Sequence, residues 1–468
     1  MPLTMSFNWR KSGLIPTAAI FTLAAASTVQ AAHAATLGEI DVSAPPYNAN
    51  LGGTVDDTAA FQNALNAAGA TGAKVRVPAG QYLFTGSLTV PAHVVMEGIN
   101  DGERSYAGYS NGTANGDVVA GQGTVLKVTG SAGNSGGPNF ITLGANAAVR
   151  NMTFYYPNQP LATSAGWNGT TPYPPTIDFG GRNGTVENVC GINPYMFIVN
   201  GSVGCTIRRV VAQPLFFGVN IDNDADTSGQ SGEHLEDVRF LNTWDNSPQM
   251  AAWTRAHTVG FAVYRADEFS MRNCTVTGCS IGFAFSASGA GSAFGTLTSC
   301  SASNCAQAVR VTACTSGAGG GLVFDGGAFG NNSDVAVSIG NQNTGSVSFN
   351  SCRFFQSNGT LISNASAYGS VVSLVGCHFH NWGLSATGLN SNVSCVVCGD
   401  LSNPTHACGK TKIMDSDFDS NQYQYAYTPG EAGILFENNS TPNGVLVQPN
   451  GAAFPSTTGP QYVQVNNF

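Results

Sequence analysis

One apolar position recurs about once every 25 residues along most of this chain, and the recurrence constrains the fold more than any other feature. The successive spacings are 37, 21, 28, 36, 26, 27, 25, 25 and 39 residues. The recurring residues are Val149, Val186, Ile207, Leu235, Met271, Leu297, Phe324, Phe349, Leu374 and Ile413. A second, mostly apolar series follows five residues later: Phe154, Gly191, Ala212, Phe240, Val276, Ala302, Phe329, Phe354, Phe379 and Phe418. Such a repeat predicts a solenoid, in which each unit buries its apolar edge only against its neighbours.

The repeating unit is predicted to be made of β-strands. Segments such as TVENV, TIRRV and VVSLVGC alternate inward and outward residues and are rich in β-branched residues. A third strand follows in segments such as IGFAF and VAVSI. Three strands in each repeat predict an all-β solenoid, a parallel β-helix of about ten coils. The hairpin signals that a β-sandwich would need are few.

Residues 1–34 have the pattern of a secretory signal peptide. Arg10 and Lys11 form a basic end, residues 14–29 are apolar and small, and residues 32–34 read Ala-His-Ala, a cleavage signal. No other stretch approaches the length of a membrane span. We therefore expect a secreted protein, extracellular or periplasmic, without a membrane anchor. The mature part is predicted to contain one β-helix domain over residues 35–430 and an irregular tail over residues 431–468.

The charge of the chain argues against one class of partner. Only 10 % of the residues are charged, and the formal net charge is −9. Binding of nucleic acid requires a basic face, which such a composition does not favour. An anionic ligand would need a local basic patch or a bridging cation. The sequence carries no signal for an oligomeric state.

All twelve cysteines follow the signal segment, so disulfide bonds are allowed. Three pairs are separated by about one coil: Cys274 and Cys300, Cys279 and Cys305, and Cys352 and Cys377. An offset of one coil places each pair side by side at about 4.8 Å, within reach of a disulfide. A column of buried free thiols fits the same spacing. Both interpretations remain open.

A separate cysteine cluster lies between the last two predicted coils. Cys395 and Cys398 are followed by His406 and Cys408, a spacing that superficially resembles a zinc knuckle. A disulfide-stapled loop is the favoured interpretation in an exported protein, and zinc binding is the alternative.

The N-terminal block resembles a known superfamily. Asp56-Asp57-Thr58 precedes apolar residues at helical spacing, and residues 75–82 then read VRVPAGQY. This block is similar to the opening of the pectate-lyase-like superfamily, which includes rhamnogalacturonase-type and tailspike-like proteins. The resemblance implies a right-handed parallel β-helix that binds or cleaves a polysaccharide in a groove along one outer sheet. We expect Asp56 or Asp57 to cap a helix over residues 57–68 that covers the open end of the stack.

An outward position follows each residue of the first core series, and down the stack it carries alternating charges. These residues are Arg150, Glu187, Arg208, Glu236 and Arg272, which we call the charge ladder. His234 is predicted to lie beside Glu236 on the same face. Such a ladder on neighbouring strands is either a structural array of ion pairs or part of a binding groove.

Acidic turns and aromatic inserts fall on the same coils. Asp222, Asp224 and Asp226 alternate in the turn that leads to His234, and the next turn carries Arg265, Asp267 and Glu268. One long insert contains Trp167, and another contains Trp253. Aromatic side chains beside a polar groove suit sugar rings. The acidic turn is either ordinary turn chemistry or a calcium site.

Two enzymatic chemistries and one non-catalytic function fit these residues. Hydrolysis of a glycosidic bond, which we favour, uses two carboxyl groups across the scissile bond. A calcium-dependent lyase acting on a uronate polymer, or a glycan-binding adhesin, are the alternatives. The candidate catalytic residues are Glu236, Glu187, Asp222 and His234, and the candidate substrate-binding residues are Arg208, Arg272, Arg265, Trp253 and Trp167. The lyase alternative would use calcium held by Asp222, Asp224 and Asp267, and no other cofactor is expected.

Overall fold

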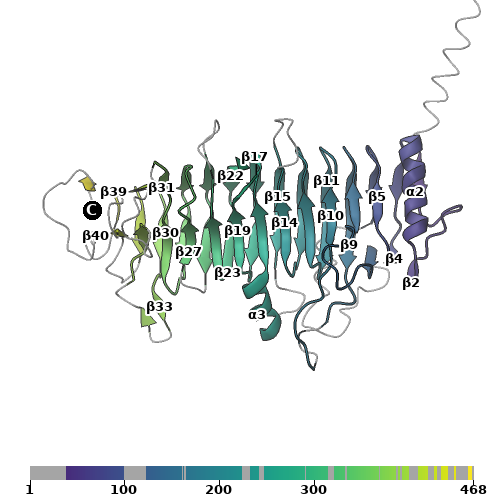
Figure 1. Cartoon of the computed structure of the whole chain (residues 1–468), viewed down its shortest axis with the longest axis horizontal. Helices are drawn as coiled ribbons and strands as arrows, with labels where there is room; N and C mark the ends of the chain where they lie inside the picture. The colour runs from purple at the N-terminus through teal and green to yellow at the C-terminus, as the bar shows by residue number, and fades with distance from the viewer. Residues whose placement is uncertain are drawn as a thin grey trace, which may run out of the picture.

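The computed structural model is an elongated solenoid, with helix α2 at its N-terminal end and the last strands at the other (Figure 1). The structure describes residues 38–99, 123–160, 162, 165–223, 232–241, 247–289, 291–314, 321–331, 335–367, 369–385, 388–389, 393–399, 409–419, 426–428, 434–440, 447–449 and 462–465. The expected signal peptide lies outside these residues. None of the described helices is both long and apolar enough to cross a membrane.

Two long parallel sheets form the walls of the solenoid, which confirms the predicted parallel β-helix. Sheet A contains β1 (Glu39–Asp41), β2 (Gly52–Asp56), β3 (Lys74–Arg76), β4 (Gly80–Phe84), β6 (Val95–Glu97), β7 (Thr124–Val128), β9 (Ala148–Tyr155), β11 (Thr185–Ile192), β13 (Thr206–Ala212), β15 (His234–Phe240), β17 (Asp267–Arg272), β18 (Thr275–Thr277), β22 (Phe294–Thr298), β23 (Ser301–Cys305), β25 (Leu322–Asp325), β26 (Ala328–Asn331), β28 (Val347–Asn350), β29 (Arg353–Phe355), β31 (Val371–Val375), β32 (His378–His380), β36 (Lys410–Met414), β37 (Asp417–Asp419), β39 (Ile434–Glu437) and β41 (Tyr462–Val465).

Sheet B forms the opposite wall. It contains β5 (Leu88–Val90), β8 (Ile141–Leu143), β10 (Pro175–Phe179), β12 (Met196–Asn200), β14 (Phe217–Ile221), β16 (Val259–Val263), β19 (Ile281–Phe285), β24 (Gln307–Val311), β27 (Val335–Ile339), β30 (Thr360–Asn364), β35 (Val396–Cys398), β38 (Ala426–Thr428) and β40 (Val447–Pro449). Two short hairpins project from the stack: β20 (Ala287–Ser288) with β21 (Gly291–Ser292), and β33 (Leu384–Ser385) with β34 (Gly388–Leu389).

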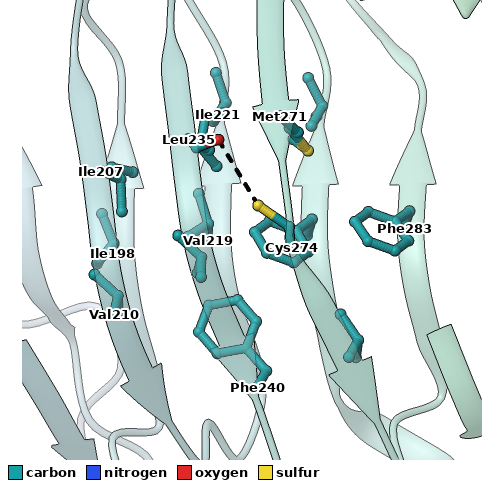
Figure 2. Packing of buried hydrophobic residues seen from close by; sticks show 14 of the residues in the cluster. Ile198, Ile207, Val210, Val219, Ile221, Leu235, Phe240, Met271, Cys274 and Phe283 are labelled. Atoms are coloured by element: carbon teal, nitrogen blue, oxygen red, sulfur yellow. Dashed lines mark hydrogen bonds between the residues drawn. The ribbon is translucent and has the colours of Figure 1, made fainter. Parts of the chain in front are cut away.

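The recurring apolar positions stack in register, as the sequence predicts. Ile207 pairs with Leu235 and Leu235 with Met271, and the first series continues in the same way from Val149 to Ile413. The second series forms its own column from Phe154 to Phe418. Figure 2 shows Ile207, Leu235 and Met271 on successive strands. Burial between the two sheets explains why these positions are apolar.

A bend with left-handed backbone connects the two strand segments of sheet A in each coil. Asn151, Asn188, Asp237 and Asn273 occupy this bend with φ between 53° and 58°. Asn and Asp tolerate this conformation better than most residues. The amide of Asn188 also donates to Asn151 Oδ1 at 2.8 Å, which links neighbouring coils. The exception in these coils is Arg209, whose φ is 52°.

Helix α2 (Thr58–Thr71) covers the N-terminal end, close to the predicted range. Its buried residues include Phe61, whose ring packs edge-on against Phe84 at 4.9 Å. The capping differs from a standard N-cap, because Asp57 occupies that position without a side-chain bond to the helix. Asp56 supplies the bond instead, accepting from the Thr58 backbone N–H at 3.1 Å and from Thr85. The helix thus covers the apolar end of the core.

The described cysteines of the three predicted pairs are buried free thiols. Each donates a hydrogen bond to a backbone carbonyl; for Cys274 one acceptor is Leu235 O, 3.9 Å from its Sγ (Figure 2). Burial raises the pKa of Cys352 to about 11 and that of Cys377 to about 12. The structure therefore has the thiol column, one of the two alternatives, rather than disulfides at these pairs.

The C-terminal part is more regular than expected. Strand β39 pairs with β36 and β41 pairs with β39, so parallel stacking continues past residue 430. Cys398 is the last residue of strand β35, and Cys395 directly precedes this strand. Both are buried in the wall of the solenoid and do not lie in a projecting loop. Burial raises the pKa of Cys395 well above its ordinary value. His406 and Cys408 lie outside the described residues.

The predicted insert that contains Trp253 forms a helix, which is an element beyond the predicted β-strands. Helix α3 (Pro248–His257) begins after Ser247, whose hydroxyl accepts from the Met250 backbone N–H at 3.3 Å. Pro at the first helical position and Ser at the N-cap are standard helix-start residues. This signal was present in the sequence.

Candidate functional site

The predicted charge ladder is present on the outer face of sheet A. Glu187 pairs in register with Arg208, Arg208 with Glu236, and Glu236 with Arg272. Arg150 precedes Glu187 in the same column. Neighbouring strands are about 4.8 Å apart, so each charged side chain lies beside one of opposite sign.

Glu187 is the centre of this ladder. Its side chain is 8 % exposed and accepts a hydrogen bond from Arg208 at 2.8 Å and another from Arg209. Arg150 lies 3.4 Å away on the other side. Burial alone would raise the pKa of Glu187, but the hydrogen bonds from Arg208 and Arg209 outweigh it, and the pKa is lowered. Glu187 is therefore held ionised, which does not suit a general acid.

Arg209 was not predicted as a site residue. It occupies the left-handed bend at which neighbouring coils carry Asn or Asp. This backbone conformation disfavours a long side chain that lacks the local hydrogen bond that Asn or Asp can make. An arginine at this bend therefore indicates a specific role for its side chain. The bend directs its guanidinium to the Glu187 carboxylate, while 58 % of the side chain stays exposed. An Arg where the repeat pattern has Asn was the signal available in the sequence.

His234 and Glu236 lie together on β15, as predicted. His234 Nε2 is 3.7 Å from Glu236 Oε2. The other ring nitrogen, Nδ1, is 2.8 Å from the Ser270 hydroxyl on the neighbouring strand. Both side chains are accessible, with 44 % of His234 and 34 % of Glu236 exposed. Ser270 is in register with His234 and fixes the orientation of the imidazole.

A buried acid lies directly before this pair. Glu233 is 1 % exposed, and its Oε1 accepts from the Asn223 amide at 2.6 Å. Burial raises the pKa of Glu233. Within the described part of the chain, Glu233 Oε2 and Asn223 Oδ1 are buried without hydrogen-bond partners. A protonated carboxyl donating from Oε2 to Asn223 Oδ1 would satisfy both atoms.

The predicted acidic turn is only partly described, because Asp224 and Asp226 lie outside the described residues. Asp222 accepts from the Ser288 hydroxyl at 2.8 Å, whereas Asp267 lies 3.7 Å from Arg265. Within the described residues, Asp222 and Asp267 belong to no group of three metal-ligating side chains. Asp222 and Asp267 thus contact different polar partners, and the calcium set of the lyase alternative remains a prediction.

The two predicted aromatic residues meet each other. Trp167 and Trp253 pack edge-on with ring centroids 5.8 Å apart. The Trp253 indole donates to Leu215 O at 3.3 Å, and its ring stacks on His257. Both residues are partly buried against an apolar cluster that includes Met250. The same cluster contains Tyr155, Cys190 and Ile192, from the second strand segments of β9 and β11.

Three arginines share the Glu187 carboxylate, while Glu97 and Glu236 lie in register with Arg150 and Arg208 on their other sides. Each of the three arginines keeps between 37 % and 58 % of its side chain exposed. Their remaining N–H groups suit bidentate recognition of a carboxylate or another anion. These arginines are the candidate for the local basic patch that an anionic ligand would need on a chain of net charge −9.

Comparison with known proteins identifies the fold. No protein-family model and no curated protein sequence matches the chain. The catalytic unit of an α-1,3-glucanase from Streptomyces thermodiastaticus is similar in structure, with a TM-score of 0.50 and 13 % identity over 92 % of this chain and 68 % of that chain. An Azotobacter vinelandii mannuronan C-5 epimerase module has a TM-score of 0.47 and 14 % identity, over 91 % of this chain and 97 % of the module.

An exopolygalacturonase from Thermotoga maritima is also similar, with a TM-score of 0.45, 12 % identity and coverage of 89 % of this chain and 92 % of that chain. The similarity to the glucanase catalytic unit agrees with the parallel β-helix fold that the resemblance implies. At such identities these similarities show the fold alone.

Proposed function

We propose that this protein is a secreted polysaccharide-active enzyme that binds an anionic, uronate-containing chain on the charge ladder and cleaves it by β-elimination. The observation that carries the proposal is the Glu187 carboxylate held by Arg150, Arg208 and Arg209. This arrangement fixes the arginines in place and leaves a large part of each arginine side chain exposed. The structural neighbours include an α-1,3-glucanase, but the choice of chemistry rests on the site.

β-Elimination needs a neutralised substrate carboxylate and a base. The exposed arginine N–H groups would bind the uronate carboxylate and stabilise the charge that develops when the proton on C5 is removed. His234 Nε2 would take this proton, and Glu236, 3.7 Å away, would stabilise the imidazolium. The C5–H electrons form the C4–C5 double bond, and the C4–O bond breaks. Its electron pair leaves with the glycosidic oxygen, which takes a proton from water.

Hydrolysis, which the sequence favoured, needs a protonated carboxyl group at the scissile bond. Glu187 does not suit this role, because its pKa is lowered. Glu233 has a raised pKa but is 1 % exposed, so a substrate does not reach it. Glu236 with Asp222 remains the pair for a hydrolase. A binding protein without catalysis is the third function, in which the ladder only holds the glycan.

Product analysis with the purified mature chain separates these functions. Polygalacturonate, polymannuronate and a neutral glucan are each incubated with the protein, with and without EDTA. We expect new reducing ends together with ultraviolet absorbance of unsaturated uronate on a polyuronate only, and persistence in EDTA. Reducing ends without absorbance would overturn elimination and establish hydrolysis. Retention on the polymer without products would establish a binding protein.

A variant separates the basic patch from the rest of the surface. Arg209→Asn restores the residue type found at this bend in neighbouring coils and removes one anchor of the patch. We expect weaker binding of polyuronate and unchanged folding. Lys412→Asn, on the outer face of a distant coil, is the matched loss of one positive charge. Equal loss of binding in both variants would mean that the ladder is not the binding surface.

A further inference from the structure

Two histidines and two aspartates lie opposite each other on neighbouring strands in the C-terminal part of the stack. His378 of β32 is in register with Asp417 of β37, and His380 is in register with Asp419. The core residues between them, Phe379 and Phe418, stack at 4.6 Å and hold the two strands together. Because side chains alternate along a strand, all four polar residues point outward.

Asp419 is the residue that the two histidines share. Its Oδ2 lies 3.4 Å from His380 Nδ1 and 4.0 Å from His378 Nε2. One ligand atom from each of His378, His380 and Asp419 lies within 4.8 Å of the other two. This is the one such group of three within the described residues. Small side-chain movements would allow these three ligand atoms to bind the same metal ion.

The remaining contacts orient the two imidazoles. Asp417 Oδ2 is 3.2 Å from His378 Nδ1, which leaves Nε2 of that ring directed to Asp419. A carboxylate on the second ring nitrogen is the outer-shell arrangement that metal-binding histidines use. His380 Nε2 is 2.7 Å from the Asn381 amide. His380 Nδ1 is itself 2.9 Å from the backbone carbonyl oxygen of Asp419. After the Asn381 amide turns over, its Oδ1 would accept a hydrogen bond from His380 Nε2, and the deprotonated Nδ1 would exchange its contact with that carbonyl for a metal.

We propose that His378, His380 and Asp419 form a surface site for a divalent transition-metal ion, with Asp417 as the positioning residue for His378. Two imidazoles and one carboxylate are the ligands of zinc, nickel or cobalt, whereas calcium and magnesium prefer oxygen ligands alone. Side chains here are 35 % to 65 % exposed, so water would complete the coordination. Arg353 lies in register with His378 on the preceding coil and brings a positive charge to the neighbouring strand.

Metal titration of the mature chain tests the site. Isothermal titration with Zn²⁺ at neutral pH is expected to show one equivalent bound and no response to Ca²⁺. Co²⁺ in place of Zn²⁺ gives a visible spectrum that reports the ligands.

Variants assign the ligands. His380→Gln and Asp419→Asn are expected to abolish binding, and Asp417→Asn to weaken it about 10- to 100-fold. His257→Gln, an exposed histidine on α3, is the matched control and is expected to bind normally. Melting of each metal-free variant checks that it folds. Absence of binding in the folded wild type, or normal binding in His380→Gln and Asp419→Asn, would overturn the proposal.

The cysteine cluster is the competing zinc site. Cys395→Ser and Cys398→Ser are expected to bind Zn²⁺ as the wild type does, and the Co²⁺ complex is expected to lack thiolate charge-transfer absorption. Loss of binding only in these cysteine variants would assign the metal to the cysteine cluster instead. Elimination activity is expected to be unchanged in His380→Gln, since the metal site and the charge ladder lie on different coils.

Discussion

His234 and Glu236 lie on the same face of β15, with His234 Nε2 3.7 Å from Glu236 Oε2 and the Ser270 hydroxyl on the opposite ring nitrogen. We therefore expect Glu236→Gln to lower the turnover of polysaccharide by about 10²- to 10⁴-fold. The substitution keeps the shape of the side chain and removes its charge, so the melting temperature is expected to change little. Initial rates of product formation measure the effect.

The control for this variant is Asp237→Asn, at the adjacent position of the same strand. Asp237 accepts from the Asn273 amide at 3.3 Å in the bend, and Asn is the residue that other bends use. Its activity is expected to match that of the wild type. Full activity in Glu236→Gln would remove this residue from the mechanism and leave the ion-pair ladder as its role.

Glu187→Gln is expected to destabilise the fold at neutral pH, by about 1–3 kcal/mol, because it removes charge-assisted hydrogen bonds. The direction in which this stability difference changes with pH follows from the lowered pKa of Glu187. Its stabilising contribution is complete above the ordinary value of 4.5 and is lost as pH falls through the folded pKa. Urea unfolding of both proteins across acidic pH is expected to show the difference shrinking. A difference independent of pH would argue against the ionised cluster.

Glu233→Gln is expected to show the opposite dependence. Burial raises the pKa of Glu233, so the folded state prefers the protonated carboxyl. That preference stabilises the wild type fully below 4.5 and is lost as pH rises through the folded pKa. Gln reproduces the protonated form and can donate to Asn223 Oδ1, so the variant is expected to be the more stable protein at high pH. Lower stability of the variant at every pH would contradict this.

Phe354→Ala is expected to cost about 3–5 kcal/mol of unfolding free energy, because the ring is fully buried. It stacks on Phe379 at 5.2 Å and packs edge-on against Phe349 at 5.4 Å. Asn350→Ala, at an outward position of the same coil, is expected to cost far less. Denaturant titration compares the two, and equal losses would mean that the inward and outward positions are misassigned.

The thiol column predicts how the cysteines react. Without reductant, a thiol reagent is expected to label Cys274, Cys300, Cys352 and Cys377 only after denaturation, since all four are buried. Burial also keeps these side chains from attack in the folded state. Mass spectrometry of labelled peptides measures this. Labelling that requires prior reduction would show disulfides in the exported protein.

Periodicity predicted the fold down to individual pairs. Ile207, Leu235 and Met271 align as expected. A shift of the strand register by one residue would turn each of these buried side chains outward, so the register is strongly specified. The same register predicted the charge ladder, whose residues each come one position after a residue of the first core series. The sequence pattern did not resolve two features: helix α3, whose start signal was overlooked, and the regular pairing of β39 and β41 beyond residue 430.

The sequence by itself determined which residues share a column, since the repeat length and the in–out alternation depend only on chain order. The tertiary structure decided which side chains of different columns and bends come close enough to interact. Glu187 was one carboxylate in a ladder until the bend brought Arg209 to it, and His378 and His380 were surface residues until β37 placed Asp419 beside them. The physical reason is that ion pairing, burial and metal coordination depend on distances of a few ångströms between coils, which spacing along one strand does not specify.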